Sequence, residues 1–177
     1  RTVYVISEIQ KREYAAIFGD KFKVLTKCAD FSPENKPAKK EPGEVLRMLY
    51  AGNVSRGREK ILALTARAIK NINSDGQRLF LDIYTSTPLS EKQRAELNLE
   101  NCSALHPPVS YSEIKKLQGE SDILVHAEAF DLRERLQVHQ SFSTKIVDYL
   151  ASDRCILAVG APDCASIKYF IDNECAA

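Results

Sequence analysis

A glycine- and arginine-rich segment, residues 52–58, directly follows an apolar run at residues 46–51. Gly52 would let a ligand approach the backbone, and the start of a following helix would offer unpaired N–H groups to an anion. Arg56 and Arg58 add guanidinium groups whose fork geometry suits phosphate. The segment therefore predicts a phosphate-binding loop; a polar loop with a solvated basic end is the alternative.

The spacing of Gly52 and Gly57 matches that of the glycines in a P-loop. However, Arg58 stands where that motif has lysine, and Glu59 stands where it has serine or threonine. The hydroxyl group that would bind magnesium is therefore missing. This excludes a P-loop NTPase.

Glu128 follows another apolar run, residues 123–126. A carboxylate at the end of a buried strand can hydrogen-bond sugar hydroxyls or stabilise positive charge that develops at a sugar carbon. A surface glutamate is the alternative interpretation. His126, inside the same run, is predicted to be a core histidine rather than a catalytic one.

Lys145 and Asp148 lie near the start of a predicted helix, for which Ser143 or Thr144 is a plausible N-cap. The three-residue spacing places Lys145 and Asp148 on one helix face. A lysine in the first turn opposes the helix dipole, which favours a nearby anion such as a diphosphate. Asp148 can accept two ribose hydroxyls. A surface salt bridge between the two side chains is the alternative.

Prolines and one apolar side chain characterise residues 106–111. Val109 is an apolar residue in a loop where a base or another flat ligand could lie, and Tyr111 could stack on it. The alternative interpretation is a rigid turn that only connects a strand to a helix.

Alternating apolar and helical patterns predict the elements that position these residues. Strands are expected at residues 3–6, 22–25, 46–51, 78–84, 103–105, 123–126 and 155–159. Helices are expected within residues 7–18, 61–69, 90–97, 111–117, 144–151 and 164–170. This alternation predicts an α/β fold with a Rossmann-like parallel sheet and helices on both faces. Ligands of such sheets bind beyond the carboxyl ends of the strands.

Two segments do not follow the alternation. Residues 29–44 contain three prolines and no apolar periodicity, which predicts a linker. Residues 131–140 are highly polar and predict a mobile flap or a helix without a packing partner.

Composition narrows the class of protein further. The chain has 177 residues, 44% of them hydrophobic, with a formal net charge of +1, which gives no global reason to bind nucleic acid. No apolar run approaches the roughly 18 residues that span a bilayer, and no signal peptide is visible. Five cysteines and three histidines show no zinc-binding spacing. We expect most of the cysteines to be buried free thiols in a reducing compartment. The abrupt ends suggest a fragment of a longer protein.

Several of these motifs occur in an order that resembles the C-terminal, donor-binding half of GT-B glycosyltransferases. The match is to the retaining, nucleotide-sugar-dependent enzymes of the group 1 type, and it extends over residues 44–177. The motifs are residues 49–53, 121–126, 128, 142–146 and 148–151. Residues 5–8, 14 and 18–19 are similar to the last strand and helix of the N-terminal half of that fold.

The resemblance implies roles for individual residues. Glu128 is the catalytic acidic residue that faces the donor sugar, and Asp148 takes the ribose. The full implied substrate-binding set, for diphosphate, base and ribose, is Gly52, Asn53, Arg56, Arg58, Val109, Ser143, Thr144, Lys145 and Asp148. The spacing from Glu128 to Asp148 is longer than in the family motif, and Asp153 replaces a usual glycine, which places the chain in a divergent branch.

The resemblance also implies an organisation and an activity. Residues 1–28 would end the N-terminal half, 29–44 would be the linker, and 45–177 would form a truncated nucleotide-sugar-binding domain. The reaction would transfer a sugar from a nucleoside diphosphate sugar to an acceptor hydroxyl, with retention and without a metal or cofactor. The fragment alone would be inactive, because the acceptor sugar or lipid-linked glycan would bind the other half.

The implied setting is cytoplasmic polysaccharide biosynthesis, where the full-length protein could associate peripherally with the inner face of a membrane. Two alternatives stay open. One is a non-catalytic nucleotide-binding module, and the other is an epimerase or phosphorylase on the GT-B fold. A response-regulator-like domain is weaker, because no acidic cluster follows the first strand.

Overall fold

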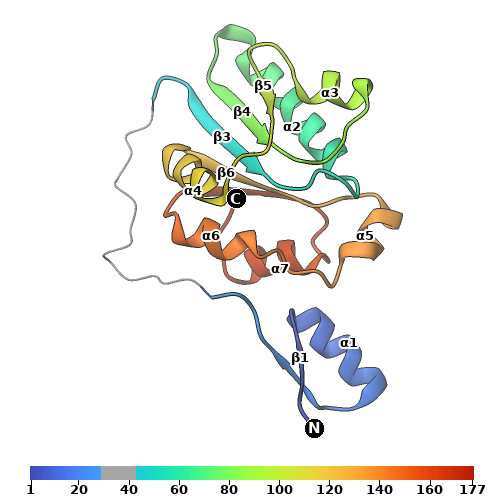
Figure 1. The fold of residues 1–177 in the computed structure, drawn as a ribbon. Helices are drawn as coiled ribbons and strands as arrows, with labels where there is room; N and C mark the ends of the chain where they lie inside the picture. The colour runs from blue at the N-terminus through green and yellow to red at the C-terminus, as the bar shows by residue number, and fades with distance from the viewer. Residues whose placement is uncertain (29–42) are drawn as a thin grey trace.

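A five-stranded parallel sheet forms the centre of the computed structural model, which describes residues 1–28 and 43–177 (Figure 1). The strand order is β5-β4-β3-β6-β7. The strands are β3 (Leu46–Ala51), β4 (Leu79–Tyr84), β5 (Ser103–His106), β6 (Ile123–Ala127) and β7 (Cys155–Val159). Each lies within one residue of its predicted bounds at both ends. The predicted linker at residues 29–44 falls, except for its last two residues, outside the described ranges.

Helices connect the strands, and their starts follow from local sequence. They are α2 (Arg58–Ile72), α3 (Glu91–Leu97), α4 (Tyr111–Glu120), α5 (Leu132–Val138), α6 (Lys145–Ala151) and α7 (Ala165–Asp172), with a 3-10 turn at Asn73–Asp75. Ser90 and Gln93 form a capping box at α3, and Ser110 caps α4 by accepting the amide proton of Glu113. No helix in the two described ranges is long and apolar enough to cross a bilayer.

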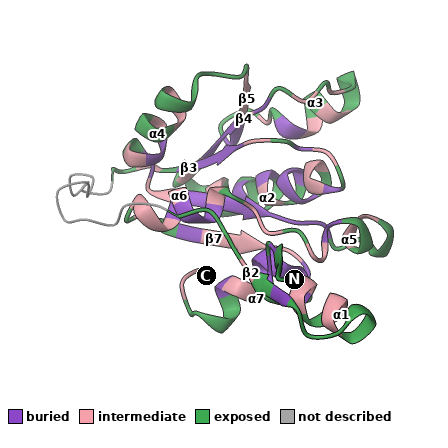
Figure 2. Ribbon diagram, turned by 60° about the horizontal axis from the view of Figure 1, so that its bottom comes forward, coloured by how far each residue is buried: buried purple, intermediate pink, exposed green. Residues whose placement is uncertain are grey.

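The sheet is packed on both faces, as the alternation predicted. Helices α2 and α3 cover one face, whereas α4, α6 and α7 cover the other. Figure 2 shows that buried residues concentrate in the strands and on the inward sides of the helices. The first core includes Tyr50, Leu62, Leu81 and Ile83, and the second includes Leu49, Leu124, Tyr149 and Phe170. Because the strand order reverses between β3 and β6, their carboxyl ends border the crevice where ligands of this fold bind.

Residues 1–28 form a small separate unit, the N-terminal unit. Strand β1 (Val3–Val5) pairs in parallel with β2 (Phe22–Val24), and α1 (Glu8–Phe18) connects them. Ser7 caps α1 by accepting the amide proton of Gln10, and Gly19 ends it, both as predicted. In Figure 1 this unit lies below the large sheet, beside α7 and the segment that follows α5. Its Ser7 hydroxyl donates to the carbonyl of Gln140 over 2.8 Å, which ties the two parts together.

The polar segment at residues 131–140 contains helix α5, which was one of the two expectations, and Leu132 and Leu136 on this helix are exposed. The helix is not wholly without a packing partner, however. Asp131 caps α5, and the buried Val138 packs in a small core with Ile167 of α7 and with Ala161 and Cys164, which precede α7. After the helix, His139 and Gln140 contact Glu13 of α1. The partner is thus 126 residues away in sequence, a distance at which local patterning carries no signal.

The cysteines correct another expectation. All five are free, but only Cys102 and Cys164 are buried, whereas Cys28 and Cys155 are exposed and Cys175 is intermediate. Cys155 begins β7, which is an edge strand, and this explains why apolar sequence neighbours do not bury it.

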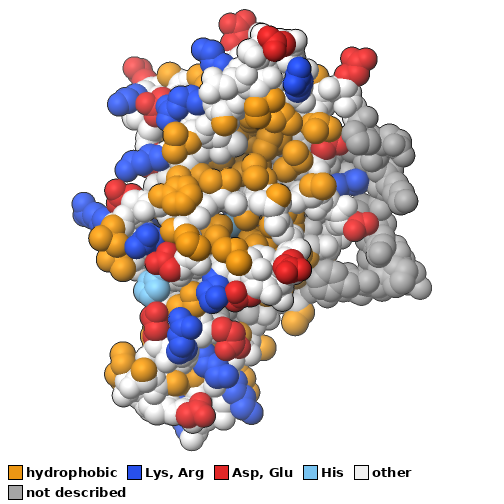
Figure 3. Space-filling view, turned by 180° about the vertical axis from the view of Figure 1, so that it is seen from behind, with side chains coloured by type: hydrophobic (Ala, Val, Ile, Leu, Met, Phe, Trp, Pro, Cys, Tyr) orange, Lys and Arg blue, Asp and Glu red, His pale blue; other side chains and the backbone are white. Residues whose placement is uncertain are grey.

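The side of the molecule opposite to that of Figure 1 has a distinct surface. Figure 3 shows hydrophobic side chains gathered over its centre, with lysine, arginine and acidic side chains mainly around them and on the N-terminal unit. Charged side chains are therefore unevenly distributed over this face of the molecule.

Candidate functional site

Three charged side chains meet beyond the carboxyl ends of β3 and β6. Glu128 is only 3% exposed. Nη2 of Arg58 donates to both of its carboxylate oxygens, over 3.0 and 2.8 Å, and Nε of Arg58 donates to the carbonyl of Ala127 over 3.2 Å. Because Arg58 is the first residue of α2, the loop after β3 carries it directly to the end of β6. The alternative that Glu128 is a surface residue is therefore wrong.

Lys145 completes this cluster from the start of α6. Its ammonium nitrogen lies 4.4 Å from the centroid of the Tyr50 ring. A Cβ atom built on Gly52 would lie 2.7 Å from that nitrogen, and Gly52 has a φ of +146°. Glycine at position 52 therefore lets the lysine reach the backbone, so the close approach predicted for Gly52 is made by a side chain of the protein itself. We call Arg58, Glu128 and Lys145 the charged cluster.

Burial and mutual interactions set the charges of the cluster. Burial and, after it, the positive charge of Arg58 lower the pKa of Lys145 to about 8, against the opposing effect of Glu128. Burial also disfavours the Arg58 cation, but the adjacent Glu128 outweighs this and raises the pKa of Arg58. Two cations therefore flank one carboxylate near neutral pH, which is an arrangement that attracts a further anion.

His126 lies next to Glu128 and is only 1% exposed, as expected of a core histidine. Its Nε2 atom is 3.7 Å from Oε1 of Glu128, and its ring meets Phe170 edge-on with the centroids 5.3 Å apart. Burial, followed by the charges of Lys145 and Arg58, lowers the pKa of His126 to about 3. Neither ring nitrogen hydrogen-bonds to any residue that the structure describes.

The start of α2 differs from the prediction in one respect, because the amides of its first residues are already paired. The amides of Arg58 and Glu59 donate to the carbonyls of Ser55 and Val54, over 3.4 and 2.9 Å. The amide of Gly52 donates to Tyr84 over 2.9 Å. The first two amides of α2 are therefore not free to bind an anion.

The loop turns back on itself before α2 because the backbone is left-handed at two neighbouring positions. Arg56 has a φ of 59° and Gly57 a φ of 80°. Arg56 itself is exposed and does not join the charged cluster. Asn53 is also exposed, and its Oδ1 accepts the amide proton of Ser55 over 2.7 Å, which stabilises the turn.

Ser143 orients the start of α6, whereas Thr144 does not. Thr144 occupies the N-cap position, but its side chain makes no capping hydrogen bond. The Ser143 hydroxyl accepts the amide proton of Lys145 over 3.4 Å, and the Ser143 amide donates to Ser166 over 3.2 Å. Ser143 thereby helps to position the backbone of Lys145.

Asp148 is paired with groups other than Lys145. The ammonium group of Lys27 lies 2.8 Å from both carboxylate oxygens, and the Tyr111 hydroxyl donates to Oδ1 over 3.1 Å. These contacts with Asp148 raise the pKa of Lys27. The alternative of a Lys145–Asp148 salt bridge is therefore wrong. Tyr111 follows the loop that contains the exposed Val109, so this loop leads directly to Asp148.

Sequence reasoning missed Tyr50 and Lys27. Tyr50 was open to prediction, because it is the inward residue next to the end of β3. Lys27 gave no signal, since its partner is 121 residues away.

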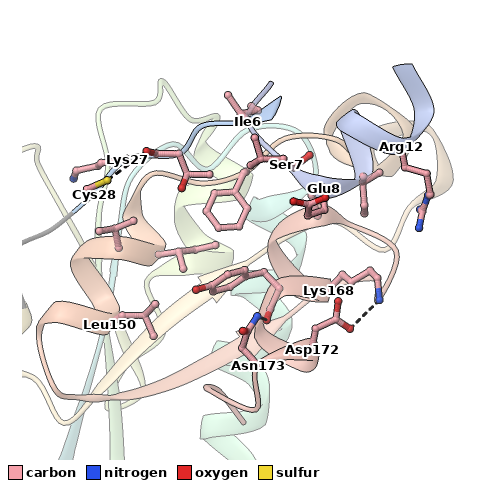
Figure 4. Close-up of a pocket in the computed structure, with 18 residues that line it drawn as sticks. Ile6, Ser7, Glu8, Arg12, Lys27, Cys28, Leu150, Lys168, Asp172 and Asn173 are labelled. Atoms are coloured by element: carbon pink, nitrogen blue, oxygen red, sulfur yellow. Dashed lines mark hydrogen bonds and ion pairs between the residues drawn. The ribbon is translucent and has the colours of Figure 1, made fainter. Parts of the chain in front are cut away.

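Two cavities lie outside the charged cluster. The larger, about 630 Å³, separates the N-terminal unit from α6 and α7 (Figure 4), and Lys27 lies on its wall. Figure 4 shows Ser7 and Glu8 on one side of this space and Leu150 and Asn173 on the other. The smaller, about 520 Å³, lies beyond β4 and β5 and is lined by His106, Pro107 and Pro108 among others. None of the three charged-cluster residues lines either cavity.

Comparison with solved structures identifies the fold. No protein-family model and no curated protein matches the sequence. The structure is similar to that of WaaG, a glycosyltransferase involved in lipopolysaccharide biosynthesis, with a TM-score of 0.62, 12% identity, and 98% of this chain and 48% of WaaG covered. It is also similar to TarM, with a TM-score of 0.60, 14% identity, and 89% of this chain and 29% of TarM covered.

A chain of the GtfA/B complex is similar too, with a TM-score of 0.53, 14% identity, and 88% of this chain and 29% of that chain covered. The chain thus spans between 29% and 48% of the length of these three proteins. At such low identities the likeness establishes the fold. That fold is a parallel five-stranded sheet between helices, and it matches one Rossmann-like half of GT-B glycosyltransferases.

Proposed function

We propose that this chain is the donor-binding half of a glycosyltransferase, which moves a sugar from a nucleoside diphosphate sugar to an acceptor hydroxyl with retention. The observation that carries the proposal is the convergence of Arg58, Glu128 and Lys145 beside Gly52, at the strand ends where this fold binds ligands. The similarity of the fold to that of WaaG supports it.

Each member of the charged cluster has a role in the proposed reaction. Lys145 and Arg58 neutralise the diphosphate as it leaves, and stabilisation of a leaving group by fixed charge is a large catalytic term. Glu128 orients the donor sugar. Because side-chain cations supply the leaving-group stabilisation, the proposal includes no metal or cofactor.

The remaining donor contacts in the proposal come from Asp148, three residues after Lys145 on α6, and from the loop before α4. Asp148 takes the ribose hydroxyls, and the hydrogen bond from Tyr111 to Asp148 supports this by linking the acid to the loop that contains Val109. In the proposal the base lies against that loop. The acceptor, a sugar or a lipid-linked glycan, binds outside residues 45–177, and the reaction belongs to polysaccharide synthesis at the cytoplasmic face of a membrane.

Calorimetric titration of this chain with UDP, GDP, ADP and TDP tests the donor site. We expect selective binding of one nucleotide, and loss of that binding in Lys145→Ala. Lys168→Ala is the control, because Lys168 pairs with Asp172 on α7 and is not part of the cluster. The proposal fails if the folded chain binds none of the four, or if Lys145→Ala binds as tightly as the parent.

Transfer itself requires a protein that joins this chain to an acceptor-binding half. There, Glu128→Gln is expected to lower kcat strongly while nucleotide binding persists. Unchanged transfer in Glu128→Gln would show that Glu128 is not catalytic, and nucleotide binding by a parent that transfers no sugar would instead support a non-catalytic nucleotide-binding module. Sugar isomerisation or phosphorolysis in a product analysis would support an epimerase or a phosphorylase.

A further inference from the structure

A buried histidine and a buried carboxylate face each other without a hydrogen bond. His126 and Glu128 are two residues apart at the end of β6, so their side chains leave the chain on the same side. Nε2 of His126 lies 3.7 Å from Oε1 of Glu128. These two atoms would form a hydrogen bond if they moved closer together by about 1 Å or less. Buried imidazole nitrogens normally have partners, so this arrangement needs an explanation.

Arg58 supplies the side-chain hydrogen bonds that Glu128 makes in this structure. In the proposed function, Arg58 also has to stabilise a diphosphate. Nε of Arg58 serves the Ala127 carbonyl and Nη2 serves Glu128, so a diphosphate that engages more of the guanidinium fork than Nη1 has to take Nη2 from Glu128. If Arg58 turns to the diphosphate, the buried Glu128 loses its donors, and a buried carboxylate without donors is strongly disfavoured.

We propose that His126 is a positioning residue, whose Nε2–H donates to Glu128 when Arg58 turns from Glu128 to the diphosphate. This inference rests on the proposed function and extends it. A neutral imidazole has one N–H donor, and the proposal places that proton on Nε2. Glu128 then keeps its orientation toward the donor sugar during the reaction.

The surroundings of His126 fit this role. Lys145 and Arg58 are the cations that face it, Glu128 is the carboxylate, and the edge of Phe170 packs against the ring. The two cations and burial keep the imidazole neutral, so it can donate without adding a charge. The backbone of Gly160 packs closely against Glu128, since a Cβ atom built on Gly160 would lie 2.9 Å from Cβ of Glu128.

A double-mutant cycle on this chain tests the exchange of donors without any ligand. Arg58→Met removes the guanidinium donors but keeps an apolar stem. In the parent, His126→Leu is expected to leave the urea midpoint unchanged or to raise it, because it removes unpaired polar nitrogens. In the Arg58→Met background, His126→Leu is expected to lower the midpoint, because Glu128 then has no donor. His126→Gln, which keeps an N–H near the Nε2 position, should restore it.

Equal effects of His126→Leu in both backgrounds would overturn the inference. So would an equal loss in His126→Gln and His126→Leu, because a purely steric role of the ring would produce it.

Proton NMR of ¹⁵N-histidine-labelled chain gives a second readout that does not depend on the double variant folding. The other two histidines, His106 and His139, are partly exposed and serve as internal references. In the parent, His126 should be the Nε2–H tautomer. In Arg58→Met its Nε2–H proton should move downfield, as expected when a hydrogen bond to Glu128 forms. An Nδ1–H tautomer in the parent, or an unchanged proton in Arg58→Met, would contradict the inference.

These tests separate the inference from the proposed function. Neither the cycle nor the NMR comparison uses a nucleotide, whereas the proposed function is tested by the calorimetric titration. If a nucleotide binds, its addition to the parent should shift the His126 proton in the same direction as Arg58→Met does. Binding without that shift would overturn the role of His126 and leave the donor site intact.

Discussion

Lys145 is the cation whose charge depends most on pH within the proposed donor site. Its pKa of about 8 means that it is mostly protonated at pH 7 and mostly neutral at pH 9. Because only the protonated form attracts a diphosphate, we expect nucleotide affinity to fall by up to about tenfold per pH unit above pH 8. Calorimetry between pH 7 and 9.5 measures this slope directly.

Lys145→Arg provides the matched control for the pH prediction. A guanidinium stays protonated throughout this range, so the slope should flatten even if the absolute affinity falls. A slope that persists in Lys145→Arg would assign the pH dependence to another group.

His126 makes a separate prediction about stability in acid. Its pKa of about 3 in the folded state is below that of an unfolded histidine, about 6.5. The unfolded chain therefore binds the proton more readily, and stability present above pH 6.5 is lost as the pH falls toward 3. One such group contributes a slope of at most about 1.4 kcal/mol per pH unit.

Urea unfolding at pH 7, 6, 5 and 4 measures this slope, and His126→Leu should reduce it. His139 contributes with the opposite sign. Burial lowers the pKa of His139, but the Leu136 carbonyl and Glu13 outweigh this and raise it, so its contribution is lost as the pH rises. An identical acid slope in the parent and in His126→Leu would show that carboxylates alone cause the acid sensitivity.

The connection between β7 and α7 depends on a small residue at position 160. A Cβ atom on Gly160 would lie 2.9 Å from Cβ of Glu128 and 2.9 Å from Cγ1 of Ile167. Both neighbours are buried and cannot move freely. Gly160→Ala is therefore expected to destabilise the chain by about 1–3 kcal/mol and to displace Glu128.

Gly119→Ala is the natural control for Gly160→Ala. Gly119 lies inside α4, and a Cβ atom there would meet nothing within 4 Å. Because alanine favours a helix over glycine, this variant should gain about 0.5–1 kcal/mol. Urea unfolding of both variants distinguishes the crowding at Gly160 from a general effect of replacing glycine.

The elements were largely predictable from sequence, whereas the contacts between them were not. Apolar runs located the five strands of the sheet, and serine caps such as Ser90 located helix starts. The paired amides of the loop before α2 depend on a left-handed backbone at Arg56, a residue type that seldom adopts it. Residue types indicated Glu128 and Lys145 as site residues. That they lie close to Arg58 follows only from the strand order, because β3 and β6 are neighbours in the sheet.

The attachment of the N-terminal unit depends on a few polar contacts. Glu13 binds His139 and Gln140, and Ser7 donates to the Gln140 carbonyl. The Gln140 contact, together with His139, lowers the pKa of Glu13 against the effect of burial. Glu13→Ala should therefore loosen α1 without unfolding the five-stranded sheet.

Hydrogen exchange followed by mass spectrometry can resolve this difference. In Glu13→Ala, amides of α1 should exchange faster, whereas those of β3, β4 and β6 should keep the parent rates. Glu8→Ala is the control, since the contact that the structure describes for Glu8, 3.9 Å to the half-buried Lys11, stays within α1. Faster exchange throughout the sheet would show that the two parts unfold as one unit.

The pairing of Lys27 with Asp148 links the attachment of the N-terminal unit to the proposed nucleotide site. Lys27 belongs to the N-terminal unit, and it lies within 2.8 Å of both oxygens of the carboxylate proposed to take the ribose. In the proposed donor site, a ribose that binds Asp148 competes with Lys27 for the two carboxylate oxygens. Such linkage is reciprocal, so a nucleotide weakens the attachment of the N-terminal unit by the same factor by which that attachment weakens nucleotide binding. On the proposed function, the attachment of the N-terminal unit and the occupancy of the donor site are therefore thermodynamically coupled.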